Sequence, residues 1–447
     1  MTIFWMRRDL RLEDNAALFY ALRDHGNVLP VFIFDRDILN RLNNPLDRRV
    51  WFIYEQVLAL RERLREHGSD MLVCYGVPEV VFEQILKGNL LPQVKTNGGL
   101  KQVLCNHDYE PLAIERDLKV ETALKLAGVG FKSFKDQVIF ERDEILTDSR
   151  NPYTVYTPYK KKWVSSLSDF YLKSYPVELY LDRLYRAQPK HPLPETVTLE
   201  KMGFSPVQGF VFPSVSVKAK LLKEYAEKRD FPALGATSLL GIHLRFGTVS
   251  VRELARAAKA TSDVWLSELI WREFFMQILF HFPKSATACF RPDYEKIRWR
   301  DAPEDFERWC AGTTGFPLVD AGMRELIHTG HMHNRVRMLV ASFLTKHLLI
   351  HWRAGERHFA AHLLDFELAS NVGNWQWAAG TGCDAAPYFR IFNPSTQIER
   401  FDEQRIYIKK WVPEFGTAKY PPPMVDHAMA RERCLREFKL ALKGNSK

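Results

Sequence analysis

A change of hydrophobic periodicity constrains this chain more than any other feature. Over the first 135 residues, short apolar runs such as TIFWM, NVLPVFIFD and DMLVCYG alternate with longer segments of helical period such as VWFIYEQVLALRERLREHG. Strand–helix alternation with short connections is typical of a parallel α/β sheet. From residue 216 onward the apolar positions follow a 3.6-residue period and strand signals are few. The sequence therefore predicts an α/β + all-α fold, with a parallel-sheet domain followed by an all-helical one.

A proline-rich segment separates the two patterns. Residues 187–215, AQPKHPLPETVTLEKMGFSPVQGFVFPSV, cannot sustain a helix or a central strand. We therefore expect an α/β domain at residues 1–132, an interdomain linker at 133–215 and a helical domain at 216–447. The first strand-to-helix turn, RRDLRLEDN, contains no glycine-rich phosphate loop, although the carboxyl ends of the strands can still hold a ligand.

Charge and cysteine content indicate the cellular compartment of the protein. Charges at Arg7, Arg8 and Asp9 interrupt any secretory apolar core, and no segment approaches the roughly 18 apolar residues of a membrane span. The six cysteines form no C-x-x-C pair and the histidine pairs lack a third ligand. We expect a soluble, cytoplasmic protein with reduced thiols and no metal site. The net charge of +9 permits an anionic partner such as nucleic acid.

Two segments of the helical half combine residue types of chemical interest. Glu268, Trp271 and Arg272 share one face of a largely apolar helix, where a ligand site and a salt bridge beside a core tryptophan are equally good explanations. Thr237 and Ser238 precede an apolar run and could meet a phosphate at a helix N-terminus. An ordinary N-cap is the better explanation of that segment alone.

The segment SNVGNWQWAAGTGC, residues 370–383, carries two tryptophans among small residues. Trp375 and Trp377 are two positions apart, about 200° around a helix, so their rings point to nearly opposite faces. The small neighbours would let a flat cofactor approach the backbone closely. Tight packing between helices explains the same pattern, and from the residues alone it is the better explanation.

Longer motifs change these interpretations. WMRRDLRLEDN, ELIWREFF, TGHMHNRVRM, LLIHWRAGE and NWQWAAGTGCDAAPYFRIFNP closely resemble the photolyase/cryptochrome flavoproteins, above all the class I cyclobutane pyrimidine dimer photolyases. The resemblance covers essentially the whole chain, in order. It implies a Rossmann-like antenna domain, a long linker and a helical FAD-binding domain. It further implies a monomer that binds ultraviolet-damaged DNA and splits the dimer by electron transfer from photoexcited reduced FAD.

The resemblance also implies which residues hold the flavin. Asn371 matches the asparagine that faces flavin N5, and Arg337 would pair with Asp365. Glu367 stands where close relatives often have aspartate. The expected FAD contacts are Tyr225, Thr237, Ser238, Leu240, Trp265, Arg272, Asn334, Arg337, Asp365, Glu367 and Asn371.

Matching positions further imply a lesion cavity and an electron relay. Glu268 would hydrogen-bond the dimer's bases, and Trp271 and Trp377 would stack against them, as an extruded base requires. The other expected DNA contacts are Asn334 and Met338 in the cavity, and Arg229, Arg335 and Arg390 at the phosphate backbone. The expected relay, which carries electrons from the surface to photoexcited oxidised flavin, is Trp375, Trp352 and Trp299.

Several positions depart from the family's pattern. His331 replaces a tryptophan and Asn374 a glycine, and we assign neither a role. Leu112 and Ala113 stand where folate-binding relatives hydrogen-bond their antenna, so a possible second chromophore, deazaflavin or folate, stays unidentified.

Three alternatives accompany the repair hypothesis. A (6-4) photolyase would have a histidine pair in place of Asn334 and Met338. A cryptochrome-like signalling photoreceptor without repair activity is the second, although the plant type has an acid in place of Asn371 and a long C-terminal extension. A non-catalytic DNA-binding flavoprotein is the third, and it predicts binding of damaged DNA that light does not alter.

Overall fold

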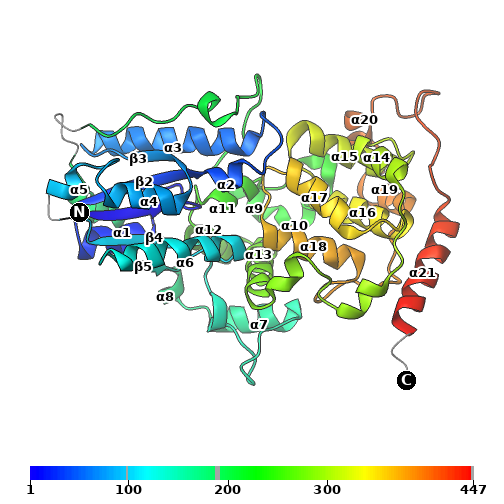
Figure 1. Ribbon diagram of the computed structural model, residues 1–447. Helices are drawn as coiled ribbons and strands as arrows, with labels where there is room; N and C mark the ends of the chain where they lie inside the picture. Colours follow the sequence, from blue (N-terminus) through cyan, green and yellow to red (C-terminus); the bar gives the residue numbers. More distant parts are fainter. Residues whose placement is uncertain (97–98, 187–191, 444–447) are drawn as a thin grey trace. The chain divides into compact units, whose positions relative to one another are not determined.

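The computed structural model describes residues 1–96, 99–186 and 192–443 (Figure 1). By their internal packing these residues form two compact units, each made of several stretches of the chain. The first comprises Met1–Glu141, Leu167–Val215 and Leu240–Ala257, and the second comprises Arg142–Ser166, Ser216–Leu239 and Ala258–Lys447. Within the described ranges, no helix combines the length and the apolar composition needed to cross a membrane.

The first unit is built on a five-stranded parallel sheet with strand order β3-β2-β1-β4-β5. The strands are β1 Thr2–Met6, β2 Val28–Asp35, β3 Leu72–Gly76, β4 Gln102–Asn106 and β5 Gly130–Phe134. Ile3 of β1 pairs with Leu29 of β2 on one side and with Val103 of β4 on the other. The direction of strand succession reverses between β1 and β4, which is where ligands bind in open α/β sheets. The parallel sheet predicted from the alternating pattern is confirmed.

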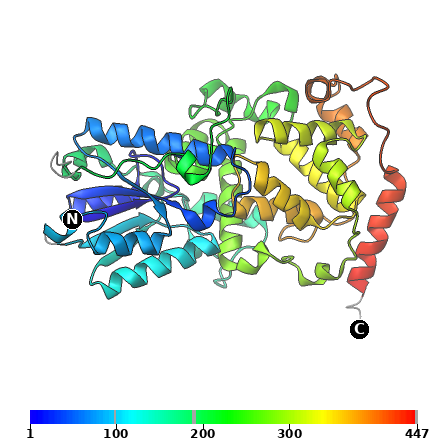
Figure 2. The same ribbon diagram turned by 45° about the horizontal axis from the view of Figure 1, so that its top comes forward.

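Helices cover both faces of this sheet. Figure 2 shows α3 on one face and α4 with α6 on the other. Trp5 belongs to the core under α4 and α6, where its ring meets Phe82 edge to face at 5.2 Å. The helices with residues in this unit are α1 Ala16–Asp24, α2 Arg36–Leu39, α3 Arg48–Glu66, α4 Pro78–Leu86, α5 Gln93–Thr96, α6 Pro111–Leu126, α8 Asp169–Leu172, α11 Gly241–Phe246 and α12 Val251–Thr261.

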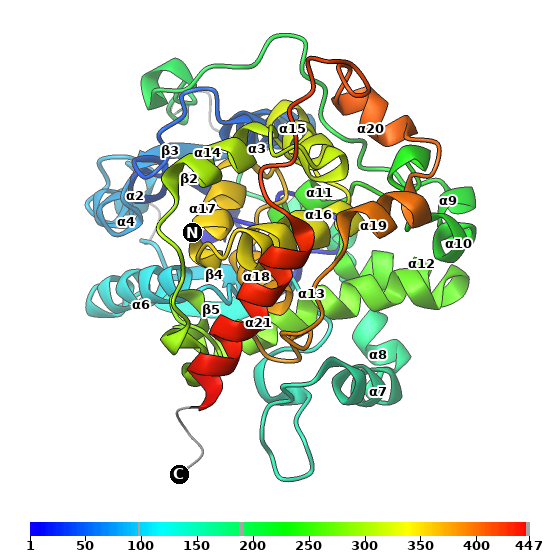
Figure 3. The ribbon, with the colours of Figure 1, turned by 90° about the vertical axis from the view of Figure 1, so that its right-hand side faces the viewer.

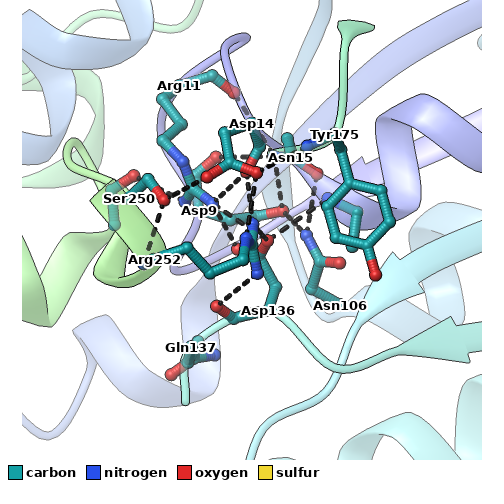
Figure 4. A network of polar contacts seen from close by, with 12 residues as sticks. Asp9, Arg11, Asp14, Asn15, Asn106, Asp136, Gln137, Tyr175, Ser250 and Arg252 are labelled. Atoms are coloured by element: carbon teal, nitrogen blue, oxygen red, sulfur yellow. Dashed lines mark hydrogen bonds and ion pairs between the residues drawn. The ribbon is translucent and has the colours of Figure 1, made fainter. Parts of the chain in front are cut away.

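A buried ionic network fastens residues 250–252 to the α/β core (Figure 4). Asp136 accepts hydrogen bonds from the guanidinium groups of Arg11, at 2.7 Å, and Arg252, at 2.8 Å. Arg252 also donates to Asp14 at 2.9 Å, and the Ser250 hydroxyl donates to the same carboxylate. Burial alone would raise the pKa of Asp136, but the two guanidinium groups outweigh it and hold the pKa below its usual value. Removing one partner would leave a buried charge uncompensated, which is strongly destabilising. The network therefore ties residues 250–252 to the unit that contains the sheet.

This network explains why packing and periodicity divide the chain differently. Residues 240–257 have helical period yet belong to the α/β unit, and residues 133–215 are shared between both units. Periodicity reports local structure, whereas the network depends on residues more than 100 positions apart. The domain boundaries at residues 132 and 215 therefore remain a prediction from the sequence.

The second unit is helical, as predicted (Figure 3). Its largest core gathers side chains from α14 through α21, including Trp309, Trp352 and Trp375. A π-helical turn, η7 Phe343–His347, follows α16 directly. The α-helices that lie wholly in this unit are α7 Tyr156–Ser166, α9 Ala219–Lys223, α10 Tyr225–Lys228, α13 Asp263–His281, α14 Pro303–Ala311, α15 Pro317–Thr329, α16 Asn334–Ser342, α17 Trp352–His362, α18 Leu368–Ala379, α19 Pro394–Phe401, α20 Ile406–Trp411 and α21 His427–Lys443.

Short 3₁₀ segments occur in both units. They are η1 Arg142–Glu144, η2 Val177–Arg183, η3 Glu200–Met202, η4 Pro232–Leu234, η5 Pro283–Ala286 and η6 Pro292–Lys296.

Two glycines let neighbouring helices approach α18 closely. Gly355 of α17 lies directly against the indole of Trp375, and Gly373 of α18 lies against the ring of Phe275 on α13. A methyl group at either position would collide with the facing ring. The small residues of the 370–383 segment therefore serve tight helix packing, and this packing fixes where the α18 side chains lie.

Candidate functional site

The two tryptophans of α18 lie in different environments. Trp375 is 2% exposed and packs against the rings of Phe359, at 5.0 Å between centroids, and Trp309, at 6.1 Å. Trp377 is only partly buried. The structure therefore puts one indole in the core and leaves the other within reach of solvent.

The amide of Asn371, one turn earlier on α18, is held in a fixed orientation. Its Nδ2 donates to the backbone oxygen of Glu356 at 3.1 Å and to Oε1 of the same residue at 2.8 Å. Both side chains are buried, and burial raises the pKa of the Glu356 carboxyl. The Oδ1 atom of Asn371 accepts no hydrogen bond from the described residues. The amide oxygen is thus the part of Asn371 that is left for a ligand.

Two ion pairs converge on the residues that precede α18. Arg337 of α16 binds Asp365 with its two terminal guanidinium nitrogens, at 2.9 and 3.3 Å. Arg272 of α13 donates to Glu367 at 3.1 Å, and the Ser370 hydroxyl donates to the other oxygen of that carboxylate at 3.0 Å. Burial alone would raise the pKa of Asp365, but the Arg337 guanidinium outweighs it and keeps the pKa below its usual value. The predicted pairing of Arg337 with Asp365 is present, and Arg272 and Glu367 form a second pair beside it.

The Thr237 and Ser238 hydroxyls are not used for capping. The helix that follows them, α11, begins at Gly241, with Leu240 at its N-cap position and no side-chain capping bond. The interpretation as an ordinary N-cap is therefore wrong, because Leu239 adopts a positive φ of 54° and delays the helix start. Neither hydroxyl makes a hydrogen bond to any residue that the structure describes, so both are available to a phosphate. Leu240 itself is buried and belongs to the α/β unit.

Two more of the expected flavin contacts are buried aromatic side chains of the helical unit. Tyr225 begins α10, with the Arg229 guanidinium 5.2 Å from its ring, and burial raises its pKa to about 12. Trp265 lies in the first turn of α13, where the Ser262 hydroxyl accepts its backbone N–H.

Glu268 and Trp271 of α13 each have a partner that their spacing alone does not identify. Glu268 accepts a hydrogen bond from Arg229 at 2.5 Å. The indole of Trp271 stacks on Tyr156, with centroids 3.5 Å apart and planes at 8°, and its centroid lies 5.5 Å from that of Phe275. Tyr156 therefore occupies one face of the Trp271 ring, which is itself only partly buried.

Tyr156 is a residue that the sequence interpretation missed, because it falls in the segment assigned to the linker. It begins α7, which packs on α13, and its hydroxyl donates to the backbone oxygen of Ser267 at 2.9 Å. A signal was available: Tyr156, Tyr159 and Trp163 recur at helical spacing and are all buried.

The arginines predicted to contact DNA differ in ion pairing and in exposure to solvent. Arg229 is paired with Glu268, and Arg335 donates to Asp230 at 2.6 Å while its guanidinium lies over the Phe401 ring at 4.4 Å. Arg390 is exposed, next to Phe389, which is 62% exposed. Asn334 is also exposed, and Met338 is partly buried one turn further along α16.

The predicted relay tryptophans form only part of a row. Trp299 is partly exposed, with its ring 5.2 Å from His351, and His351 lies 5.8 Å from the fully buried Trp352. Trp309, which the sequence analysis did not single out, is the indole that packs against Trp375. Within the described ranges, no three His, Cys, Asp or Glu side chains gather as a metal site would require.

These features define a two-unit protein whose helical unit carries two ion pairs and a fixed amide at the start of α18. The family model described as DNA photolyase matches residues 2–178, and the one described as the FAD binding domain of DNA photolyase matches residues 265–418. The chain is 37% identical to the deoxyribodipyrimidine photo-lyase of Halobacterium salinarum and 35% identical to that of Escherichia coli, covering 99% of each chain in both comparisons.

Solved structures agree with the sequence relatives. A bacterial class III photolyase from Agrobacterium tumefaciens matches with a TM-score of 0.85 and 33% identity, over 99% of this chain and 98% of that one. An archaeal photolyase from Sulfolobus tokodaii, described with two FAD molecules, matches with a TM-score of 0.78 and 32% identity over 98% and 99% of the two chains. A Synechocystis cryptochrome matches with a TM-score of 0.82 and 25% identity, over 98% of both chains. The chain belongs to the DNA photolyase family.

The residues present fit the FAD that this family's domain binds. The hydroxyls of Thr237 and Ser238, which bind none of the described residues, suit a diphosphate, and the amide oxygen of Asn371, which accepts from none of them either, suits a ring N–H.

Proposed function

We propose that this chain is a carbon–carbon lyase that repairs cyclobutane pyrimidine dimers in DNA under blue light, by electron transfer from photoexcited reduced FAD. The observation that carries the proposal is the fixed amide of Asn371, because its oxygen is the one polar atom of that side chain left for a ligand. When bound, the reduced flavin supplies the photoexcited electron, and the protein supplies position and charge. We further propose that the protein acts on ultraviolet-damaged DNA as a monomer, as the family resemblance implies.

Three polar side chains would contact two different parts of the FAD. Thr237 and Ser238 would hold the diphosphate through their hydroxyls. Asn371 would accept a hydrogen bond from flavin N5, with Glu356 holding the amide in place. The further contacts of the proposal are Tyr225, Leu240, Trp265, Arg272, Asn334, Arg337, Asp365 and Glu367.

Arg272 and Arg337 would lie beside the flavin as members of ion pairs. Arg272 and Arg337 are each already paired with a carboxylate, which lowers the cost of burying them. This arrangement suits a site that must hold the flavin in its reduced form.

The lesion would enter beside α13 and α16. Glu268 would exchange its bond to Arg229 for hydrogen bonds to the dimer's bases, which frees the Arg229 guanidinium for a phosphate. Trp271 and Trp377 would stack on the bases, with Tyr156 supporting one face of the Trp271 ring. The remaining contacts are Asn334 and Met338 in the cavity and Arg335 and Arg390 at the phosphates.

The tryptophans would return the flavin to its working state. Trp375, Trp352 and Trp299 would relay electrons from the surface to photoexcited oxidised flavin, since indoles oxidise readily and aliphatic side chains do not. The row from partly exposed Trp299 to buried Trp352 supports a surface-to-core direction for this relay.

A second chromophore has no assigned residues. Leu112 is 59% exposed on α6, and neither it nor its neighbour Ala113 can hydrogen-bond through its side chain. A folate antenna would therefore have to be held by other residues.

Light-dependent release of DNA tests the proposal against its alternatives. The reduced protein is bound to a fluorescent duplex that contains one dimer, and anisotropy is followed in the dark and under blue light. Repair predicts that light releases the duplex and that Glu268→Gln slows this release. Binding that light does not alter would support the non-catalytic flavoprotein instead, and absence of binding in both conditions would support a signalling photoreceptor.

A further inference from the structure

A lysine is buried completely in the helical unit. Lys346 has 0% of its surface exposed and lies in the π-helical turn η7, between α16 and α17. Its Nζ donates to the backbone oxygen of Arg390 at 2.9 Å, and the described residues offer it no other hydrogen bond. Burial lowers the pKa of Lys346 to about 8. Burying an ammonium group destabilises a fold unless hydrogen bonds or an opposite charge compensate it. A single carbonyl compensates only part of this cost, so the position of Lys346 needs an explanation.

The residue that Lys346 binds belongs to the loop between α18 and α19. In this loop the Arg390 N–H donates to the backbone oxygen of Pro387 at 2.8 Å. The ring of Tyr388 stacks on Phe438 of α21, with centroids 5.7 Å apart and planes at 14°. Phe389 and Arg390 are exposed. Lys346 thus holds the backbone of the loop and Phe438 packs against Tyr388, while the side chains of Phe389 and Arg390 are exposed to solvent.

The π-helical turn and α21 support this attachment together. The N–H of Leu348 donates to the oxygen of Phe343 at 3.0 Å, the i to i+5 bond that widens the turn. Arg433 of α21 donates to the backbone oxygen of His347 at 2.5 Å. A π-turn is rare in ordinary helices and is frequent at functional sites. Here it carries Lys346, and α21 carries Phe438, so both contacts to the loop come from one packed region.

We propose that Lys346 is a positioning residue for DNA: through the Arg390 carbonyl it holds the α18–α19 loop so that Arg390 meets a phosphate and Phe389 meets the bases beside the dimer. This inference rests on the proposed function. A charged donor on a backbone oxygen holds the loop in place and leaves the exposed side chains of Phe389 and Arg390 free to meet DNA. Lys346 acts on DNA only through this loop.

A double-mutant cycle tests the inference, because coupled residues give non-additive effects. Lys346→Met, Arg390→Ala and the double variant are compared for affinity to a dimer-containing duplex in the dark. Each single change is expected to weaken binding about tenfold, in line with loss of one charge-assisted contact. Because Lys346 also positions Phe389, the double variant should bind more weakly than Arg390→Ala alone, but by clearly less than the factor that Lys346→Met costs in the unchanged protein. The slope of log affinity against log salt should fall by about one in all three variants, as for one lost phosphate contact.

Two controls keep a structural role apart from a positioning role. Lys119→Met removes the same charge from a half-exposed lysine of α6 that pairs with Glu115 and belongs to the other unit, and should bind DNA as the unchanged protein does. The flavin absorption spectrum and melting temperature show whether each variant is folded. If Lys346→Met does not fold, Phe438→Leu loosens the same loop through Tyr388 and should show the same coupling to Arg390→Ala.

The outcomes separate this inference from the proposed function. Losses that multiply in the double variant overturn the inference, as do unchanged binding by Lys346→Met and unchanged binding by Arg390→Ala. If the unchanged protein does not bind damaged duplex at all, the proposed function itself fails.

Discussion

Adding one methyl group at Gly355 tests whether the position of Trp375 matters for electron transfer. A Cβ at this residue would lie 2.1 Å from Cη2 of Trp375 and 2.5 Å from its Cζ3. Ordinary contact begins at 3.4 Å, so the ring edge must withdraw by about 1.3 Å, the difference between 3.4 and 2.1 Å. Leu344 blocks another direction of relief, since its Cδ2 would lie 2.6 Å from the new atom.

The expected cost of Gly355→Ala follows from two opposing effects. Overpacking a well-packed core costs about 1–3 kcal/mol. Replacing glycine by alanine inside a helix returns about 1 kcal/mol. We therefore expect the free energy of unfolding to fall by about 0–2 kcal/mol, which leaves the protein folded at 25 °C. Photoreduction of the oxidised flavin should slow several-fold, because the displaced indole is the expected first member of the relay.

Gly373→Ala is the matched control for this change. Its Cβ would lie 2.1 Å from Phe275, so the strain is similar, but it falls on the α13 side of α18 and away from Trp375. Chemical denaturation gives the stability of both variants, and flash absorption gives the photoreduction rate. Equal slowing in both variants, or no slowing in Gly355→Ala despite a measured loss of stability, would refute the reasoning.

Three further predictions follow from other residues. Trp375→Phe should abolish photoreduction of oxidised FAD while leaving repair by chemically reduced enzyme nearly intact, as continuous illumination of each form will show; loss of both activities would remove Trp375 from the relay. Glu268→Gln should bind FAD normally, with an unchanged flavin spectrum, yet repair fewer dimers per absorbed photon, and an unchanged quantum yield would contradict its role at the lesion. His333 caps α16 by accepting the Arg335 N–H on Nδ1 at 3.2 Å, and burial lowers its pKa to about 4. The unfolded chain takes up this proton near pH 6.5, so the free energy of unfolding should fall as pH is lowered from 6.5 to 4, by up to about 3 kcal/mol for this residue. His333→Asn, which can still cap, should show a shallower pH dependence in denaturation curves, and an unchanged slope would contradict the assignment.

The fold could be predicted from periodicity because each element carries its own local signal. The strand TIFWM is buried throughout, as expected for the centre of a parallel sheet covered on both faces. The membership of residues 250–252 could not be predicted, because it depends on ion pairs between Arg252 and residues 14 and 136. Helical period is the same whichever unit a helix joins.

The site shows the same division between local and long-range information. The resemblance gave residue types and positions, and the pairing of Arg337 with Asp365 agrees with it. Contacts between distant segments were missed: Tyr156 on Trp271, Trp309 beside Trp375, and Lys346 under the loop of Arg390. None of these can be found from spacing, since each joins side chains that only the packed helices bring together.

The central claim is tested most directly by counting dimers. Protein with its flavin verified as reduced is mixed with excess oligonucleotide that contains one cyclobutane dimer, and the dimer is quantified by chromatography after dark incubation and after blue light. The account predicts loss of dimer only in the light, with several molecules repaired per protein and intact pyrimidines as the product. No loss of dimer by the reduced, illuminated protein would contradict it.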